Sequence, residues 1–100
     1  MGLTRYERNR RFLDSLKSAP CHDCGLTFPP AVMDFDHVRG VKLADVSSLV
    51  NATRGALEEE VWKCEVVCAT CHRLRTRRRQ LDAHVDAAEA YDVLVSLHDE

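Results

Sequence analysis

Residues 21–24, Cys-His-Asp-Cys, and residues 68–71, Cys-Ala-Thr-Cys, form two hooks in which two residues separate a pair of cysteines. Two intervening residues allow a tight turn to present both sulfurs to one ion, while backbone N–H groups point at the sulfurs. Two such hooks supply the four thiolates of a tetrahedral site. We therefore expect Cys21, Cys24, Cys68 and Cys71 to bind one structural Zn²⁺.

Other interpretations of the hooks are weaker. A redox pair would sit in a βαβ pattern, and no such pattern surrounds either hook. The run Cys68-Ala-Thr-Cys71-His72 also spells a haem-attachment motif, with Met33 as a conceivable second axial ligand. Against haem, the N-terminus carries no export signal and the first hook would have no role. His22 could replace one cysteine as a zinc ligand, and the remaining cysteine, Cys64, is expected to be a small buried hydrophobe.

A second group of chemically active residues lies beside this frame. Asp34-Phe-Asp36-His37-Val38 stands between the hooks, and His72 directly follows Cys71. Consecutive residues of a helix point about 100° apart, so Cys71 can face the zinc while His72 faces elsewhere. A strand packed beside that helix would bring Asp36 and His37 opposite His72.

This combination suits the hydrolysis of a phosphodiester. A neutral His37 can take the proton of the attacking water. Asp36 and His72 can hold a divalent ion that stabilises the developing negative charge. Arg73 and Arg75 follow on the same helix and are expected to contact phosphates.

The chain resembles the HNH endonucleases through Cys21-x-x-Cys24-Gly, Asp36-His37-Val38 and Val67-Cys68-x-x-Cys71-His72-Arg73. It is most similar to the small zinc-stapled members of phages and bacteria. The resemblance implies a ββα-metal fold and metal-dependent cleavage of DNA. It also implies that His37 is the general base and that Asp36 and His72 hold a catalytic Mg²⁺, Mn²⁺, Ni²⁺ or Zn²⁺. The four cysteines would hold the structural zinc.

The family usually carries an asparagine shortly before the second hook. Residues 62–67 read Trp-Lys-Cys-Glu-Val-Val, and the nearest asparagine is Asn51. A carbonyl or another side chain must therefore orient His37. The missing asparagine also favours an alternative function, a zinc-bound DNA-binding or assembly module whose nuclease site has decayed.

Hydrophobic patterns around these motifs predict one α+β domain over residues 1–100. A basic helix is expected at 4–18, a zinc-stapled ββα core at about 20–80 and an acidic helix at about 82–98 that starts at Asp82. Within the core we expect a strand at 31–38, short helices at 47–52 and 57–62, a short strand at 65–67 and a helix at 70–80. Trp62 is expected in the core, and residues 58–60 on a solvated helix face.

The charge distribution is uneven. Residues 1–79 contain all 14 Lys and Arg with 10 Asp and Glu, whereas residues 80–100 contain six acidic residues. The basic part fits DNA as a partner, with Arg39 and Lys42 as further phosphate contacts. The acidic C-terminal helix could bind a protein partner, cover the basic face or aid solubility. Without a signal peptide or an apolar span, we expect no membrane contact and a cytoplasmic location in a bacterium or a phage-infected host.

Overall fold

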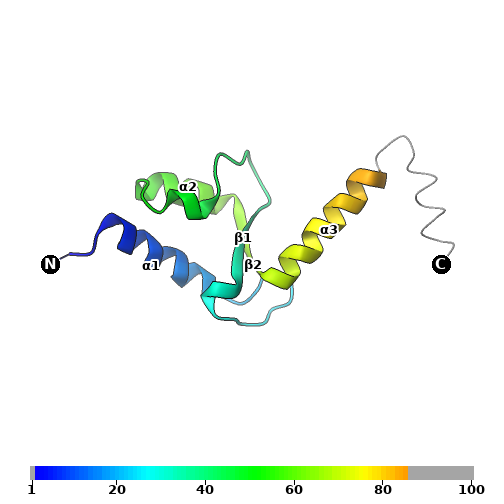
Figure 1. The fold of residues 1–100 in the computed structure, drawn as a ribbon, viewed down its shortest axis with the longest axis horizontal. Helices are drawn as coiled ribbons and strands as arrows, with labels where there is room; N and C mark the ends of the chain where they lie inside the picture. The colour runs from blue at the N-terminus through cyan, green and yellow to red at the C-terminus, as the bar shows by residue number, and fades with distance from the viewer. Residues whose placement is uncertain (1, 86–100) are drawn as a thin grey trace.

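The computed structural model describes residues 2–85, which form three α-helices and one two-stranded sheet (Figure 1). The elements in chain order are α1 (Arg5–Lys17), β1 (Met33–His37), α2 (Arg54–Trp62), β2 (Cys64–Cys68) and α3 (Ala69–Val85). Short 3₁₀ turns at Pro30–Val32 and Val46–Leu49 precede β1 and α2. The expected small α+β fold is confirmed. No helix of the described residues is long and apolar enough to cross a membrane.

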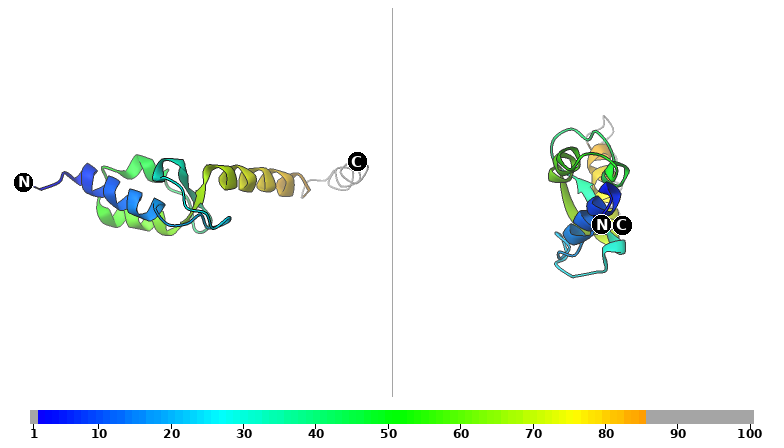
Figure 2. Two further views of the ribbon diagram at one scale, coloured as in Figure 1. Left: turned by 90° about the horizontal axis from the view of Figure 1, so that it is seen from below. Right: turned by 90° about the vertical axis from the view of Figure 1, so that its left-hand side faces the viewer.

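The sheet lies at the centre of the molecule. β1 and β2 run antiparallel, with Met33 opposite Cys68 and His37 opposite Cys64. In Figure 2, α1 and α2 gather at one end, and α3 leaves the sheet toward the other end. β2 passes into α3 without a loop, because β2 ends at Cys68 and α3 begins at Ala69. The second cysteine hook therefore spans the junction between strand and helix.

The N-terminal helix is capped and then anchored to the insertion between the strands. The Thr4 side chain accepts a hydrogen bond from the backbone N–H of Glu7, as the sequence predicts. Asn9 is buried, and its amide donates to the carbonyls of Val50 and Ala52 at 2.9 and 3.0 Å. A buried amide with these partners ties α1 to the segment that leads into α2.

Two hydrophobic clusters stabilise opposite ends of the sheet. One surrounds the cysteine hooks and contains Met33 and Val67, which are almost fully buried. The other joins the helices to the sheet and contains Leu13, Val46 and Leu57, with Phe35 packed against them. The cysteine hooks and the helical insertion thus have separate small cores, which share the two strands.

Three expectations about the elements need correction. The expected strand 31–38 is shorter, because Pro30–Val32 forms a 3₁₀ turn. Asp82 does not start a new helix, since α3 runs unbroken through it to Val85. Trp62 is 67% exposed rather than in the core, because it ends α2 at the surface and carries the Arg39 guanidinium over its ring. The remainder of the acidic helix expected at 82–98 lies outside the described residues.

Candidate metal centre and catalytic pocket

The four hook cysteines meet at one point. The sulfur atoms of Cys21, Cys24, Cys68 and Cys71 all lie within 4.8 Å of one another. Sulfurs that bind one tetrahedral zinc at about 2.3 Å lie roughly 3.8 Å apart, so this spacing suits that ion. His22 lies outside the group, and its Nε2 atom is 3.1 Å from a Glu65 oxygen. The cluster can therefore hold a structural metal such as zinc.

Local backbone geometry prepares the sulfurs for a cation. Gly25 adopts a φ of +73°, and its N–H bonds to the Cys21 carbonyl at 2.9 Å, which closes the first hook. The N–H of Cys68 points at the Cys21 sulfur at 3.3 Å, and the N–H of Cys71 points at the Cys68 sulfur at 3.4 Å. Although burial raises it, N–H groups of Cys24, Cys68 and Asp23 lower the pKa of Cys21 to about 6.

The close spacing of the four thiols disfavours ionisation of all of them together. The adjacent Cys68 sulfur, burial and the other sulfurs raise the pKa of Cys71 to about 12. Four thiolates at this spacing would repel one another, and a bound Zn²⁺ removes that repulsion. Cys64 takes no part in the cluster; burial raises its pKa to about 11, and its thiol contacts the Glu60 carbonyl. It is only partly buried, less than expected.

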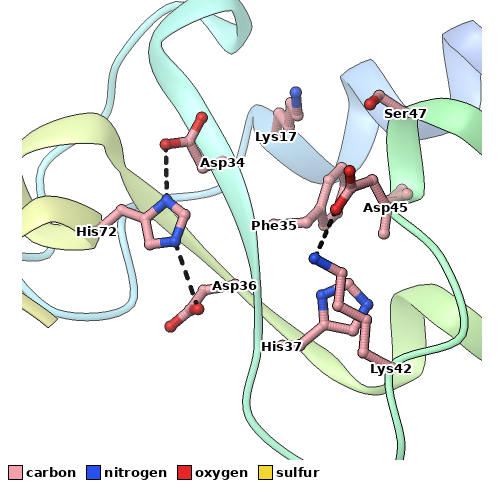
Figure 3. A pocket seen from close by; sticks show the side chains of 10 residues that line it. Lys17, Asp34, Phe35, Asp36, His37, Lys42, Asp45, Ser47 and His72 are labelled. Carbon is pink, nitrogen blue, oxygen red and sulfur yellow. Dashed lines mark hydrogen bonds and ion pairs between the residues drawn. The ribbon is translucent and has the colours of Figure 1, made fainter. Parts of the chain in front are cut away.

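A pocket of about 380 Å³ lies along β1 and collects the predicted catalytic residues (Figure 3). Its wall includes Asp36 and His37 from β1, Lys42 from the loop after β1, and His72 from α3. Figure 3 shows Asp34, Asp36 and His72 on one side of the strand, with His37 and Lys42 on the other. Residues far apart in the sequence are thus brought to one cavity. Its lining also includes Lys17, Asp34, Phe35, Asp45, Val46 and Ser47.

His72 lies between two carboxylates of β1. Its Nδ1 atom is 3.0 Å from Oδ2 of Asp34, and its Nε2 atom is 3.5 Å from Oδ1 of Asp36. A carboxylate that accepts the Nδ1 proton leaves the Nε2 lone pair free, which is the usual arrangement of a metal-binding histidine. The Asp36 and His72 pair therefore has a donor set that fits a divalent cation.

Asp36 also binds the guanidinium groups of two arginines. Arg75 donates to it at 2.9 Å, and Arg79 donates to both oxygens at 2.9 and 2.7 Å. Asp36 is 4% exposed. Although burial raises it, Arg79 and Arg75 hold the pKa of Asp36 below its usual range, so the carboxylate is ionised at neutral pH. A cation bound to Asp36 must share this carboxylate with the arginines.

His37 is held from the opposite face of the sheet. Its Nε2 atom lies 2.8 Å from Oε2 of Glu60, whose side chain is 3% exposed. The ammonium group of Lys63 lies 2.9 Å from Oε1 of Glu60, and the N–H of Leu43 donates to Oε2 at 3.0 Å. Lys63 contributes most to lowering the pKa of Glu60, to about 2. Glu60 is therefore an ionised acceptor and not the solvated residue that we expected.

The predicted phosphate contacts have different environments. The Arg75 guanidinium binds the carboxylates of Asp23, Asp36 and Glu65, and its side chain is only 11% exposed, so it lies within an ion-pair network. Arg39 lies against Trp62 and the Cys64 carbonyl, and it is not one of the residues that line the pocket.

The other two predicted contacts are more accessible. Lys42 lines the pocket and pairs with Asp45 at 2.6 Å. Arg73 is exposed on α3.

Sequence reasoning missed three residues of this centre, Asp34, Glu60 and Arg79. Asp34 precedes Asp36 by two positions, and a strand places such residues on the same face. Glu60 follows Leu57 by three positions, which places it on the buried side of α2. Arg79 follows Arg75 by four positions, so both reach the same carboxylate from α3. Each signal is a spacing that the sequence already contains.

Comparison of the chain with protein-family models, with curated proteins and with solved structures found no match.

Proposed function

We propose that this chain is a divalent-metal-dependent DNA endonuclease of the HNH type, with β1, β2 and the start of α3 as its ββα-metal core. One observation carries the proposal most strongly. His37, Asp36 and His72 line a single pocket, and a carboxylate contacts one ring nitrogen of each histidine. A proton acceptor and a carboxylate–imidazole pair that line the same pocket are the groups that hydrolysis of a phosphodiester requires.

In this proposal His37 is the general base. Its Nε2 atom faces an ionised carboxylate and carries the proton, so Nδ1 is the basic atom that takes a proton from the attacking water. Asp36 and His72 would hold a Mg²⁺, Mn²⁺, Ni²⁺ or Zn²⁺ ion. When bound, that ion would stabilise the negative charge on the phosphate and on the leaving oxygen.

The remaining residues bind and position the substrate. Lys17 and Lys42 line the pocket and can neutralise a phosphate, and exposed Arg73 lies on the same helix as His72. The Cys₄ site holds the start of α3 against β1, which sets the position of His72 relative to Asp36. DNA is the proposed substrate because several Lys and Arg side chains surround an anionic reaction centre.

A second function has one specific observation in its favour. Arg75 and Arg79 donate three hydrogen bonds to Asp36, the carboxylate that the catalytic ion needs. If these contacts persist with DNA bound, the chain is a zinc-stapled DNA-binding or assembly module rather than an enzyme. The two functions differ in one measurable property, which is cleavage.

Plasmid cleavage by wild type and by His37→Ala separates them. Reactions contain Mg²⁺, Mn²⁺, Ni²⁺ or EDTA, and zinc content is measured to show that each protein is folded. We expect wild type to cut and His37→Ala to cut about 10²–10⁴-fold more slowly. His98→Ala, in the segment outside the described residues, is the matched control. Equal cutting by wild type and His37→Ala would remove His37 as the base; DNA binding by wild type without cutting would support the binding module.

A further inference from the structure

Glu60 is a buried carboxylate with an unusual set of partners. Its residue exposure is 2%, although glutamate is rarely buried unless it is paired. One oxygen faces Lys63, and the other faces both the Leu43 N–H and the Nε2 atom of His37. Burial of a charge is costly, so a buried carboxylate needs partners such as these. The choice of each of the three partners requires an explanation.

A purely structural role would explain two of the three contacts. Lys63 also donates to the Val41 carbonyl at 2.7 Å, so Glu60 and Lys63 together tie the loop after β1 to the end of α2. This loop carries Lys42 and Asp45 into the pocket. Loop anchoring does not require the third contact, which joins the carboxylate to the histidine of the pocket at 2.8 Å.

The third contact determines which nitrogen of His37 is basic. An ionised carboxylate only accepts hydrogen bonds, so the Nε2 atom that faces it must carry the proton. The lone pair of a neutral His37 then resides on Nδ1. A carboxylate that holds a catalytic histidine in one tautomer and one orientation is a known way to prepare a general base.

We propose that Glu60 is the positioning residue of His37, holding the ring in its Nε2–H tautomer so that Nδ1 accepts the proton of the attacking water. This inference rests on the proposed function. It also assigns to Glu60 the orientation of His37, for which residues 62–67 offer no asparagine. The orienting group comes from α2, which belongs to the insertion between the strands, and not from the strand that leads to the second hook.

The first test is a spectrum that requires no activity. Long-range ¹H–¹⁵N correlation of the imidazole nitrogens, at a pH where His37 is neutral, reports its tautomer in the zinc-loaded wild type. We expect Nε2–H in wild type and a mixture of tautomers in Glu60→Gln. A glutamine oxygen has fewer acceptor sites than a carboxylate, and three donors compete for it. Nδ1–H in wild type would overturn the proposal, even if Glu60→Gln failed to fold.

The second test is kinetic and uses a matched variant. Glu59→Gln makes the same charge change one residue away, at an exposed position of α2. We expect Glu60→Gln to lower kcat roughly 10²–10⁴-fold with little change in KM, and Glu59→Gln to leave both nearly unchanged. A Glu60→Gln enzyme with wild-type kcat would overturn the positioning role. Absence of wild-type cleavage, with the Nε2–H tautomer present only when Glu60 is intact, would remove the nuclease function while supporting the orientation of His37 by Glu60.

Discussion

Asp34 and His72 form a carboxylate–imidazole pair, with 3.0 Å between Oδ2 of Asp34 and Nδ1 of His72. The pair directs the other ring nitrogen toward Asp36, at 3.5 Å. Two carboxylates on one face of a short strand therefore contact both nitrogens of one imidazole. Such an outer partner sets the tautomer of a metal-binding histidine and strengthens it as a ligand.

Asp34→Ala is expected to weaken binding of the divalent ion that we propose at Asp36 and His72. Loss of the Asp34 carboxylate frees the His72 ring to rotate and to change tautomer, and loss of such a partner costs about 10–100-fold in metal affinity. Titration with Mn²⁺, followed by electron paramagnetic resonance, measures the dissociation constant. Asp45→Asn, in the same pocket but paired with Lys42, is the control. Equal Mn²⁺ affinity in wild type and Asp34→Ala would contradict the role assigned to Asp34.

Arg79→Ala is expected to strengthen binding of the same ion. Arg79 competes for both oxygens of Asp36, and its own side chain is 50% exposed. An ion pair with one partner this exposed contributes little, so the Mn²⁺ dissociation constant should fall by no more than about fivefold. Arg78→Ala, at the neighbouring exposed position, should leave it unchanged. Weaker Mn²⁺ binding in Arg79→Ala would show that Arg79 supports the site rather than competing with the ion.

Zinc removal is expected to unfold the protein. Cys21 and Cys68 are buried within the cluster that includes Met33 and Val67, so loss of the ion exposes that cluster to water. Binding of structural zinc contributes about 10–16 kcal/mol in small zinc domains, which is as large as the net stability of most domains. Circular dichroism during titration with a chelator measures the effect. Cys68→Ser should lack zinc and structure, whereas Cys64→Ser should retain one zinc per chain.

Leu57→Ala is expected to lower the free energy of unfolding by about 2–5 kcal/mol. Leu57 is 0% exposed and joins α2 to Leu13 and Val46 in the second cluster, so the shorter side chain leaves a cavity. Urea unfolding of the zinc-loaded proteins measures this change. Leu43→Ala removes the same atoms at a side chain that is 78% exposed, and it should change stability by less than about 0.5 kcal/mol. Equal effects of the two substitutions would contradict the packing of α2 described here.

Acid is expected to weaken the contribution of Glu60 to stability. Its pKa falls from 4.5 to about 2 in the folded chain, chiefly because Lys63 pairs with it, and the Leu43 N–H and His37 also contact it. A lowered pKa stabilises the folded state above the unfolded value of 4.5, and this contribution declines as the pH falls toward 2.

Urea unfolding of wild type and Glu60→Gln between pH 6 and pH 3 tests the linkage. The stability difference between the two proteins should shrink as the pH falls. Zinc release in acid affects both proteins, and Glu59→Gln gives the baseline for a charge change on α2. A difference independent of pH would show that Glu60 is not linked to folding through its charge.

The spacing of the cysteines carried most of the information about the fold. Two C-x-x-C hooks predict the sulfur cluster, and that cluster places the strand before the second hook beside the strand after the first. The period of two in a strand also separates Asp36 from His37, so their opposite faces follow from their adjacency. These features depend on local spacing, which a sequence displays directly.

Features that depend on long-range packing were not predictable in the same way. Glu60 looked like one of three solvated acids, because only the docking of α2 on the sheet brings His37 to its carboxylate. Trp62 looked like a core residue by its size, but the end of α2 leaves it at the surface. Asp82 has the side chain of a helix cap, but α3 continues through it to Val85.

One strand of five residues supplies both halves of the proposed reaction centre. The side chains of Asp34 and Asp36 contact α3 on one side of β1. Those of Phe35 and His37 contact the helices on the other side. One residue inserted between Met33 and Asp34 would exchange these two sets, because every later side chain of the strand then turns to the opposite face. The position of each residue along β1 is thus as important to the proposed function as the identity of its side chain. Such an insertion should abolish the proposed activity with all of the reactive residues still present.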